Sequence, residues 1–246
     1  MMRRLARFVV ALSSLGACGT PNTSTSVVHI ATALGEEHNG TYNLGPVALH
    51  GSFHNSCSPY APELEASLGE NLAGLALGYN QDGSLCDTCV TLKRANGKQV
   101  TARVITTGET VGPNDIDLSQ KAFDALGGDD YPRKMTWAVV KCPTTGVGSA
   151  STDKIKYQFQ TESNPDWTSL WVRGARLPLR TVEVKKGSKG SWVTLQRGTD
   201  GSLTDASGFG TGRFELRLTA YDGTVVTDAF DKFTAGAVLS SAHQFD

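Results

Sequence analysis

The chain has 246 residues, enough for one large domain or two small ones, and its formal net charge is −1 at pH 7. This near-neutral balance excludes the strongly basic footprint of a nucleic-acid-binding protein. Gly is abundant, with 27 residues, and β-branched and aromatic residues recur in short runs. The composition predicts an all-β protein built from many short strands and tight turns.

The first 18 residues have the features of a targeting segment. Arg3, Arg4 and Arg7 precede an apolar run, residues 8–12, that is too short to span a membrane. The tetrad Leu-Gly-Ala-Cys that follows resembles a bacterial lipobox, in which Cys18 is acylated and becomes the new N-terminus. The alternative is an ordinary signal peptide with an incidental cysteine.

A polar segment, residues 19–37, follows this cysteine and is rich in Thr, Ser and Asn. It predicts a flexible tether that holds the first domain away from a membrane. Gly19 stands where an Asp commonly marks retention in the inner membrane. We therefore expect a secreted or cell-surface protein, an outer-membrane lipoprotein that meets the membrane only through its lipid anchor.

Four further cysteines, Cys57, Cys86, Cys89 and Cys142, form an even set. In an exported protein such a set predicts two disulfides, for which three pairings exist. The C-x-x-C spacing also occurs in zinc sites and thioredoxin-like proteins. Zinc needs two more ligands, and a thioredoxin motif needs a helix after its first cysteine, whereas residues 89–92 continue as a strand. Structural disulfides are favoured, and we expect no metal and no cofactor.

The pattern up to residue 143 predicts a first β domain. Residues 89–92 and 100–105 are expected as strands that an Asn-Gly turn joins into a hairpin. Ser119 is a good N-cap for a short helix with one apolar stripe. Residues 135–140 are apolar throughout, which is typical of a strand buried on both faces.

A linker and a second β domain follow. Residues 144–153 are rich in Gly, Ser and Thr, which is typical of a linker. Beyond them apolar and polar residues alternate, as at 155–160 and 213–218, and Tyr221–Thr224 predicts a hairpin turn. Short alternating strands over residues 154–246 predict a β-sandwich.

Five stretches of the chain form a series: Thr41-Tyr42, the C-x-x-C entry to a strand, N-D-I-D-L-S-Q-K-A-F from Asn114, W-A-V-V-K-C from Trp137, and W-T-S-L-W-V-R-G-A-R-L-P-L from Trp167. The series covers roughly residues 39–246 and resembles the expansins, two-domain proteins that loosen polysaccharide walls without obvious hydrolysis. The resemblance implies a six-stranded double-psi β-barrel over residues 38–143. An immunoglobulin-like carbohydrate-binding sandwich then follows over residues 154–246. It also implies the pairings Cys57–Cys86 and Cys89–Cys142.

The resemblance assigns functional residues to the barrel. By motif, Asp117 matches the groove Asp of expansins, which corresponds to a glycosidase general acid able to protonate or hydrogen-bond a glycosidic oxygen. Thr41 matches a groove Thr whose hydroxyl bonds that Asp or a sugar. Tyr42 is a groove wall or a core aromatic, and Asp115 is a further candidate contact for the substrate. The alternative for both aspartates is a turn and helix-entry role before Ser119.

Two positions depart from the expansin pattern. Expansins carry an Asp near the end of the strand at 100–105 and an aromatic or Cys two residues later, where this chain has Thr106 and Gly108. Glu109 or Asp115 is a candidate substitute, but no spacing supports either. Inverting glycosidases need an acid and a base about 6.5–9.5 Å apart. With one well-supported carboxylate, we expect a protein that is not a hydrolase.

The sandwich of expansins presents three aromatics in a row to flat glucan chains. Trp167 matches one of them, whereas Asp166 and Asp200 stand at the places of the others. Trp167 and Trp171 share one face of a strand, roughly 13 Å apart at ~3.3 Å per residue, and Leu170 faces the core. We therefore expect Trp167 and Trp171 to stack on sugar rings; the alternative for each is a packed core side chain.

A basic stretch continues from this strand. Its usual meaning is a solvated sheet surface, and the alternative is a site for an anionic wall polymer. The residues are Arg173, Arg176, Arg180, Lys185, Lys186 and Lys189.

The resemblance implies a monomer that binds a β-glucan or another cell-wall polysaccharide across both domains and loosens it without breaking a covalent bond. Two alternatives remain open. The barrel is a glycoside hydrolase or a peptidoglycan lytic transglycosylase, or the protein is a surface polysaccharide adhesin with an inactive barrel. Sugar release separates the enzymes from the other two, and creep of a cellulosic sheet separates loosening from adhesion.

Overall fold

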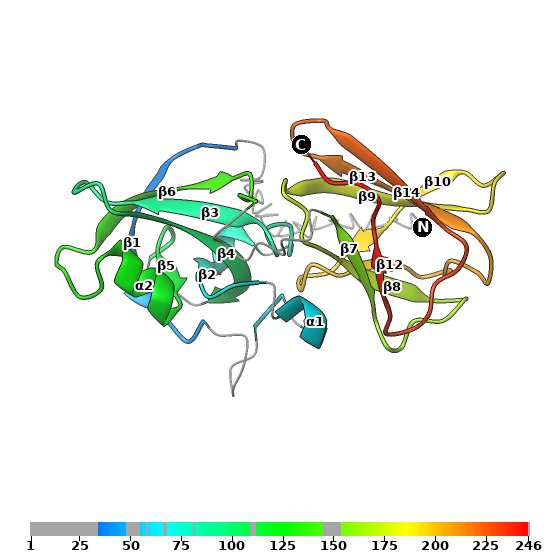
Figure 1. Cartoon of the computed structure of the whole chain (residues 1–246), viewed down its shortest axis with the longest axis horizontal. Coiled ribbons are helices and arrows are strands. Elements are labelled where there is room, and N and C mark those ends of the chain that lie inside the picture. The colour runs from blue at the N-terminus through cyan, green and yellow to red at the C-terminus, as the bar shows by residue number, and fades with distance from the viewer. Residues whose placement is uncertain are drawn as a thin grey trace, which may run out of the picture.

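The computed structural model describes residues 34–47, 55–57, 59–65, 68–80, 82–108, 112–144 and 154–245. Within these ranges the protein is a closed β-barrel beside a two-sheet β-sandwich (Figure 1), so the predicted all-β class is confirmed. Cys18, most of the tether and residues 145–153 of the linker lie outside the described residues. Lipidation and the boundaries between domains therefore stay predictions.

Six strands close the barrel in the order β1-β5-β2-β4-β3-β6, with β1–β5 and β2–β4 parallel and the other pairs antiparallel. Neighbours in the barrel are mostly not neighbours in sequence, so the chain crosses over between strands. The strands are β1 (His38–Leu44), β2 (Leu72–Ala76), β3 (Cys89–Lys93), β4 (Gln99–Gly108), β5 (Ile116–Leu118) and β6 (Lys134–Val140); the helices are α1 (Pro62–Glu65), the 3-10 turn η2 (Leu77–Tyr79) and α2 (Gln120–Leu126).

Helix α2 covers the barrel through the apolar stripe that the sequence predicts, since Ala122, Phe123 and Leu126 are all buried. Ser119 is the N-cap residue of α2, as predicted, but it does not cap the helix with its side chain. Its hydroxyl makes no bond to the helix; it donates to the carbonyl of Glu70 at 2.6 Å and accepts the N–H of Leu72 at 3.1 Å. Ser119 therefore ties the end of β5 to the start of β2, which fixes the strand that carries Asp117.

The sandwich has a four-stranded sheet, β10-β9-β13-β14, and a five-stranded sheet, β11-β12-β8-β7-β15. Alternating residues of both sheets form its core, and a group of phenylalanines packs in edge-to-face and stacked pairs. The strands are β7 (Lys156–Phe159), β8 (Thr168–Arg173), β9 (Leu179–Lys186), β10 (Trp192–Thr194), β11 (Gln196–Arg197), β12 (Leu203–Asp205), β13 (Phe214–Ala220), β14 (Val225–Phe230) and β15 (Val238–Ser240).

Both disulfides of the barrel domain are formed. Cys57 bonds Cys86 at 2.05 Å and Cys89 bonds Cys142 at 2.08 Å. The structural interpretation of the C-x-x-C spacing is therefore confirmed. The second disulfide also lies at the boundary with the sandwich, because the Cys142 N–H donates to the carbonyl of Arg176 at 2.8 Å.

Arg173 at the end of β8 crosses from the sandwich into the barrel domain and is only 2% exposed. Its Nη1 lies 2.5 Å from Oδ2 of Asp87, and its Nη2 donates to the carbonyls of Cys57 at 3.0 Å and Pro59 at 2.7 Å. The guanidinium also stacks 4.0 Å from the ring centre of Tyr60. The expectation that Arg173 belongs to a solvated sheet surface is wrong: it joins the two domains.

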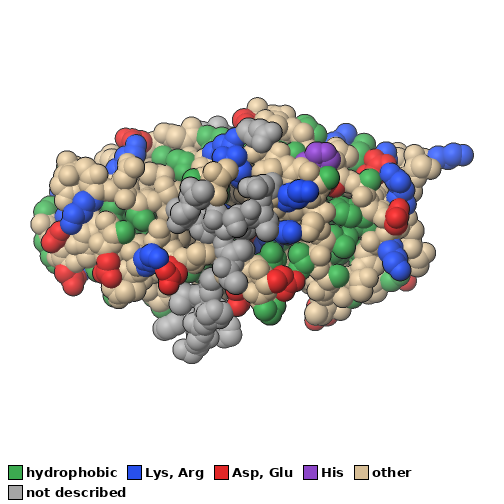
Figure 2. Space-filling model, in the orientation of Figure 1, with side chains coloured by type: hydrophobic (Ala, Val, Ile, Leu, Met, Phe, Trp, Pro, Cys, Tyr) green, Lys and Arg blue, Asp and Glu red, His purple; other side chains and the backbone are tan. Residues whose placement is uncertain are grey.

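The rest of the basic stretch is not a continuous basic surface. Lys185 pairs with Glu215 and Lys186 pairs with Asp205, each at 2.7 Å. Figure 2 shows acidic and basic side chains interspersed over both halves of the face in view. This mixture gives an anionic polymer no extended field to follow.

Two glycines let the backbones of the domains approach closely. A Cβ on Gly83 would lie 2.4 Å from the carbonyl oxygen of Gly198, and one on Gly201 would lie 2.8 Å from the Cβ of Cys86. Both glycines have positive φ, 68° and 77°, which disfavours any other residue. The contact is therefore a close fit of backbone against backbone.

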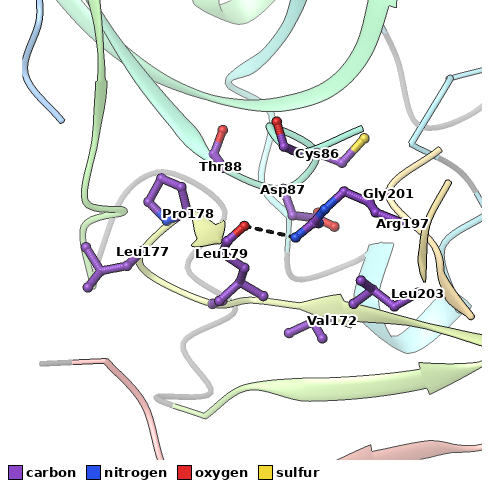
Figure 3. Close-up of a pocket in the computed structure, with 12 residues that line it drawn as sticks. Cys86, Asp87, Thr88, Val172, Leu177, Pro178, Leu179, Arg197, Gly201 and Leu203 are labelled. Carbon is purple, nitrogen blue, oxygen red and sulfur yellow. Dashed lines mark hydrogen bonds between the residues drawn. The ribbon is translucent and has the colours of Figure 1, made fainter. Parts of the chain in front are cut away.

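A small cavity of about 20 Å³ remains in this contact (Figure 3), with Asp87 on the barrel side and Leu203 on the sandwich side. Arg197 reaches across one side of it and donates to the carbonyl of Leu179 at 2.9 Å. Burial lowers the pKa of Arg197. The space holds about one water molecule, so it is not a sugar site.

Arg173→Met is expected to lower the free energy of unfolding by about 3–5 kcal/mol, because Asp87 is left buried without its counter-charge. Urea denaturation measures the change. Adding Asp87→Asn should recover part of the loss, since Asn removes the stranded charge and tolerates the φ of 65° at this position. Lys121→Met, which breaks the exposed Lys121–Glu70 pair, should have no resolvable effect. An Arg173→Met protein as stable as wild type would show that the pair contributes nothing to the fold.

Candidate functional site

Four residues on four neighbouring strands form a row across the barrel. Asn43 of β1 pairs with Asp117 of β5, Asp117 pairs with Gly74 of β2, and Gly74 pairs with Thr106 of β4. The register shifts between Ala73 and Gly74, so that Thr106 takes the place opposite Gly74. Bulges of this kind re-aim side chains beside functional sites.

Glycines let the neighbouring backbone approach Asp117 closely. A Cβ on Gly45 would lie 2.4 Å from the Cβ of Asp117, a distance that no other residue can adopt. A Cβ on Gly74 would lie 2.9 Å from Cγ2 of Thr106 and 3.8 Å from the Cβ of Asp117. Asp117 and Thr106 thus lie on either side of Gly74, with no side chain between them.

The wall opposite Asp117 carries hydroxyl groups. Thr106 Oγ1 accepts the N–H of Ser56 at 3.1 Å, and Ser56 Oγ lies 2.9 Å from Oγ1 of Thr107. Hydroxyls can bond a sugar but do not accept a proton from water at neutral pH. The row therefore combines one carboxylate with several hydroxyl groups.

Asp115 is held by the loop in which it lies. Its Oδ1 accepts the backbone N–H of Thr41 at 2.9 Å, and its carboxylate sits close enough to Gly112 to leave no room for a Cβ there. Thr41 and Asp115 thus lie together through the backbone of Thr41, whereas the expected partner of the Thr41 hydroxyl was Asp117 or a sugar. Whether the Thr41 hydroxyl serves the groove stays a prediction.

The pKa of the Asp117 carboxyl is raised, first because burial penalises its ionised form and second because the charge of Asp115 lies nearby. The group therefore keeps its proton to a higher pH than an ordinary Asp. Mildly acidic conditions favour the form that donates a hydrogen bond to an ether or hydroxyl oxygen.

Tyr42 is not a groove residue. It is fully buried in the barrel core, packs edge-to-face on Phe123 with ring centres 5.6 Å apart, and has the guanidinium of Arg94 5.6 Å from its ring centre. Its hydroxyl donates to the carbonyl of Gly128 at 3.3 Å. The expected contact of Tyr42 with substrate is therefore corrected to a structural role. Side chains alternate along β1, so Tyr42 faces the core while the residues directly before and after it face outward.

The two tryptophans of the sandwich differ in exposure. Trp167 is partly exposed and belongs to neither hydrophobic core cluster. Trp171 is only 4% exposed, so the expected open stacking surface there is wrong. Leu170 and Val172 do face the core, but the barrel domain covers the other face of the strand, with Arg173 5.2 Å from the Trp171 ring.

Among the described residues, no group of three His, Cys, Asp or Glu side chains is placed to hold a metal ion. No helix in the part of the chain that the structure describes is long and apolar enough to cross a membrane.

Solved structures share this arrangement. The crystal structure of the apo expansin of Clavibacter michiganensis superposes with a TM-score of 0.65 at 20% identity, covering 85% of this chain and 96% of that one. A mutant of that expansin in complex with cellohexaose superposes with a TM-score of 0.66 at 18% identity. These likenesses show the fold, a double-psi barrel followed by a second β domain.

Curated proteins match by sequence as well. Expansin-YoaJ of Bacillus subtilis (strain 168) is 30% identical over 118 residues, which is 48% of this chain and 47% of that protein. Expansin-like protein 3 of Dictyostelium discoideum is 24% identical over 179 residues, 71% of this chain and 51% of that protein. The chain is thus similar to expansins in sequence and in fold. It spans about half the length of these relatives, and no family model matches it.

Asp115→Asn in this expansin-like chain is expected to lower the pKa of Asp117, because it removes the neighbouring charge while an amide oxygen can still accept the Thr41 N–H. The pKa should stay above the usual value of about 3.9, since burial is the larger cause. Carboxyl ¹³C NMR titration measures it, with the exposed Asp222→Asn in the sandwich as the control. A wild-type value at or below ~3.9 would contradict this account.

Trp167→Ala is expected to weaken binding to insoluble cellulose several-fold, since stacking one sugar on an exposed aromatic contributes about 1 kcal/mol. Depletion binding isotherms measure the affinity and thermal melting measures the fold. The control is Val225→Ala, an exposed apolar residue on the other sheet. A large fall in melting temperature without a change in affinity would make Trp167 a structural residue.

Proposed function

We propose that this chain binds a cell-wall β-glucan along the barrel groove and the Trp167 face, and that it loosens the polymer without hydrolysis. The observation that carries the proposal is the row across the barrel, which combines one carboxylate, Asp117, with the hydroxyl-bearing Thr106 where a second carboxylate would be needed. The likeness to expansins, one of them in complex with cellohexaose, supports it.

The proposed mechanism uses Asp117 as a hydrogen-bond donor. Its raised pKa keeps a fraction of the carboxyl protonated, and this proton can be shared with a glycosidic or hydroxyl oxygen of a chain lying in the groove. Cleavage would need a second group to activate water or to attack the sugar. Asp115 is held by the Thr41 N–H, and Thr106 has no carboxylate, so the bond between sugars is not broken.

Loosening follows from differential binding. A chain pulled away from its neighbours exposes hydroxyls that the groove can bond, whereas a packed chain keeps them paired. The protein then stabilises the separated state by its difference in affinity for the two states. The Arg173–Asp87 pair fixes the domains relative to each other, so both contacts can act on one polymer chain.

Thr41 on β1 is proposed to assist Asp117 through its hydroxyl. We also propose that the protein acts outside the cell as a monomer, held at the outer membrane by acylated Cys18. Mass spectrometry of the mature N-terminus tests the lipid directly.

Asp117→Asn is expected to abolish creep of a cellulosic sheet under load while changing cellulose affinity less than twofold, because the Asn amide keeps the shape and still donates N–H bonds but has no acidic O–H proton to share with a glycosidic oxygen. Wild-type creep should rise as the pH falls through the raised pKa of Asp117, since protonation creates the donor. Extensometry across a pH series, with sugar release measured in parallel, checks both statements.

Two results would contradict this function. Release of sugar or peptidoglycan fragments by wild type that disappears in Asp117→Asn would indicate a hydrolase or lytic transglycosylase. Binding without creep at any pH would indicate an adhesin. Thr106→Asp is the gain-of-function test: it should raise creep, since it restores the expansin pattern opposite Asp117.

A further inference from the structure

A second, larger cleft lies where the barrel domain meets the five-stranded sheet. Its volume is about 560 Å³, which is enough for a sugar unit. The barrel side is the segment from Pro59 to Pro62, just before α1, and the sandwich side comes from β7, the turn after it, and β8. Both domains are therefore needed to form it.

The walls of the cleft combine an aromatic side chain with polar ones. Trp171 lines it, and the indole N–H of this buried residue has no hydrogen-bond partner among the described residues. Gln158 is fixed beside it, donating to the carbonyl of Pro59 at 3.1 Å and accepting the N–H of Ala61 at 3.2 Å. An aromatic wall with convergent polar groups is the usual composition of a site for a small polar molecule.

The charge of the cleft has one sign. Glu162 and Asp200 line it, and none of its lining residues is a Lys, Arg or His. Neither carboxylate has a cation of the described chain within salt-bridge distance; Asp200 Oδ1 accepts only the N–H of Ser202, at 2.9 Å. Asp166 is also exposed, next to Trp167 in the chain, but it does not line the cleft. A cation entering here would find two unpaired negative charges.

We propose that this cleft binds an amine-bearing sugar unit, so that the protein prefers wall polysaccharides with protonated amino groups, such as β-1,4-linked glucosamine, over neutral or uronate chains. The proposal rests on the polysaccharide binding proposed above and deepens it. Two solvent-accessible carboxylates attract a protonated amine and repel a uronate, and such partly exposed pairs together change an affinity by about fivefold. At position 200, which is usually aromatic in expansins, a charge thereby replaces stacking area.

Four hexamers of matched length test the preference by isothermal titration calorimetry at about pH 5.5, where amines are protonated. They are glucosamine, N-acetylglucosamine, glucose (cellohexaose) and galacturonate. Wild type is expected to bind the glucosamine hexamer about fivefold more tightly than its acetylated form, and the galacturonate hexamer most weakly. The difference should shrink in high salt, which screens the charges.

The double variant Glu162→Gln/Asp200→Asn locates the effect. Both changes keep the side-chain shape, and the amide introduced at position 200 retains an oxygen for the Ser202 N–H, so the fold should persist. The variant is expected to lose the preference for the amine while keeping its cellohexaose affinity within twofold. Asp231→Asn, which removes one exposed charge outside the cleft lining, should keep the preference.

Equal binding of the free and acetylated glucosamine hexamers by wild type would overturn the proposal, as would an unchanged preference in the double variant. If cellohexaose binds wild type in those experiments, the proposed function stands and only the assignment of the cleft falls. If no hexamer binds, both fall together.

Discussion

The buried pair between Arg173 and Asp87 is the contact on which the arrangement of this protein depends. Removing two charges from water costs several kcal/mol, and the pair offsets this only through the added bonds to the carbonyls of Cys57 and Pro59. The first disulfide fixes Cys57, so Arg173 bonds to a segment whose position the disulfide already restrains. The same segment forms one wall of the larger cleft, and the pair therefore shapes a surface that neither domain has alone.

The barrel packs closely around Asp117 because glycines stand beside it. Gly45 and Gly74 have neighbours so close that a Cβ would clash, so only glycine lets these backbones approach. The cost is conformational, since Gly in a strand loses more freedom on folding than other residues. Ser119 offsets it by bonding β5 to the start of β2 on the same edge. The candidate carboxylate thus stands on a strand of three residues that its neighbours hold in place.

The sequence predicts the strands from local alternation and the presence of two disulfides from the even set of cysteines, whereas the pairing followed from the resemblance to expansins. Leu170 and Val172 follow the pattern and face the core. The sequence prediction fails for Trp171 and Arg173. Both side chains point away from the sandwich core, as predicted, but they are buried instead of exposed. Alternation identifies a face of a strand and says nothing about what covers that face. For Tyr42 the resemblance suggested a substrate contact, although the alternation of side chains along the strand already indicated that Tyr42 faces the core. The Ser119 hydroxyl was misassigned because its partners lie some fifty positions away in the chain.

The residues at positions 106 and 200 differ from the expansin pattern, and their surroundings in the two domains explain what these differences do. Thr106 lies two strands from Asp117, on the other side of Gly74, and carries a hydroxyl where cleavage would need a carboxylate to activate water. Asp200 lies in the cleft opposite the Pro59 segment, where an aromatic would have no flat chain to stack on, because the barrel domain closes over Trp171. The close fit at Gly83 and Gly201, next to Asp200 in the chain, brings the domains together on this side. In the proposed binding mode, a polymer chain would meet Trp167 and then a charged cleft, rather than one continuous aromatic row.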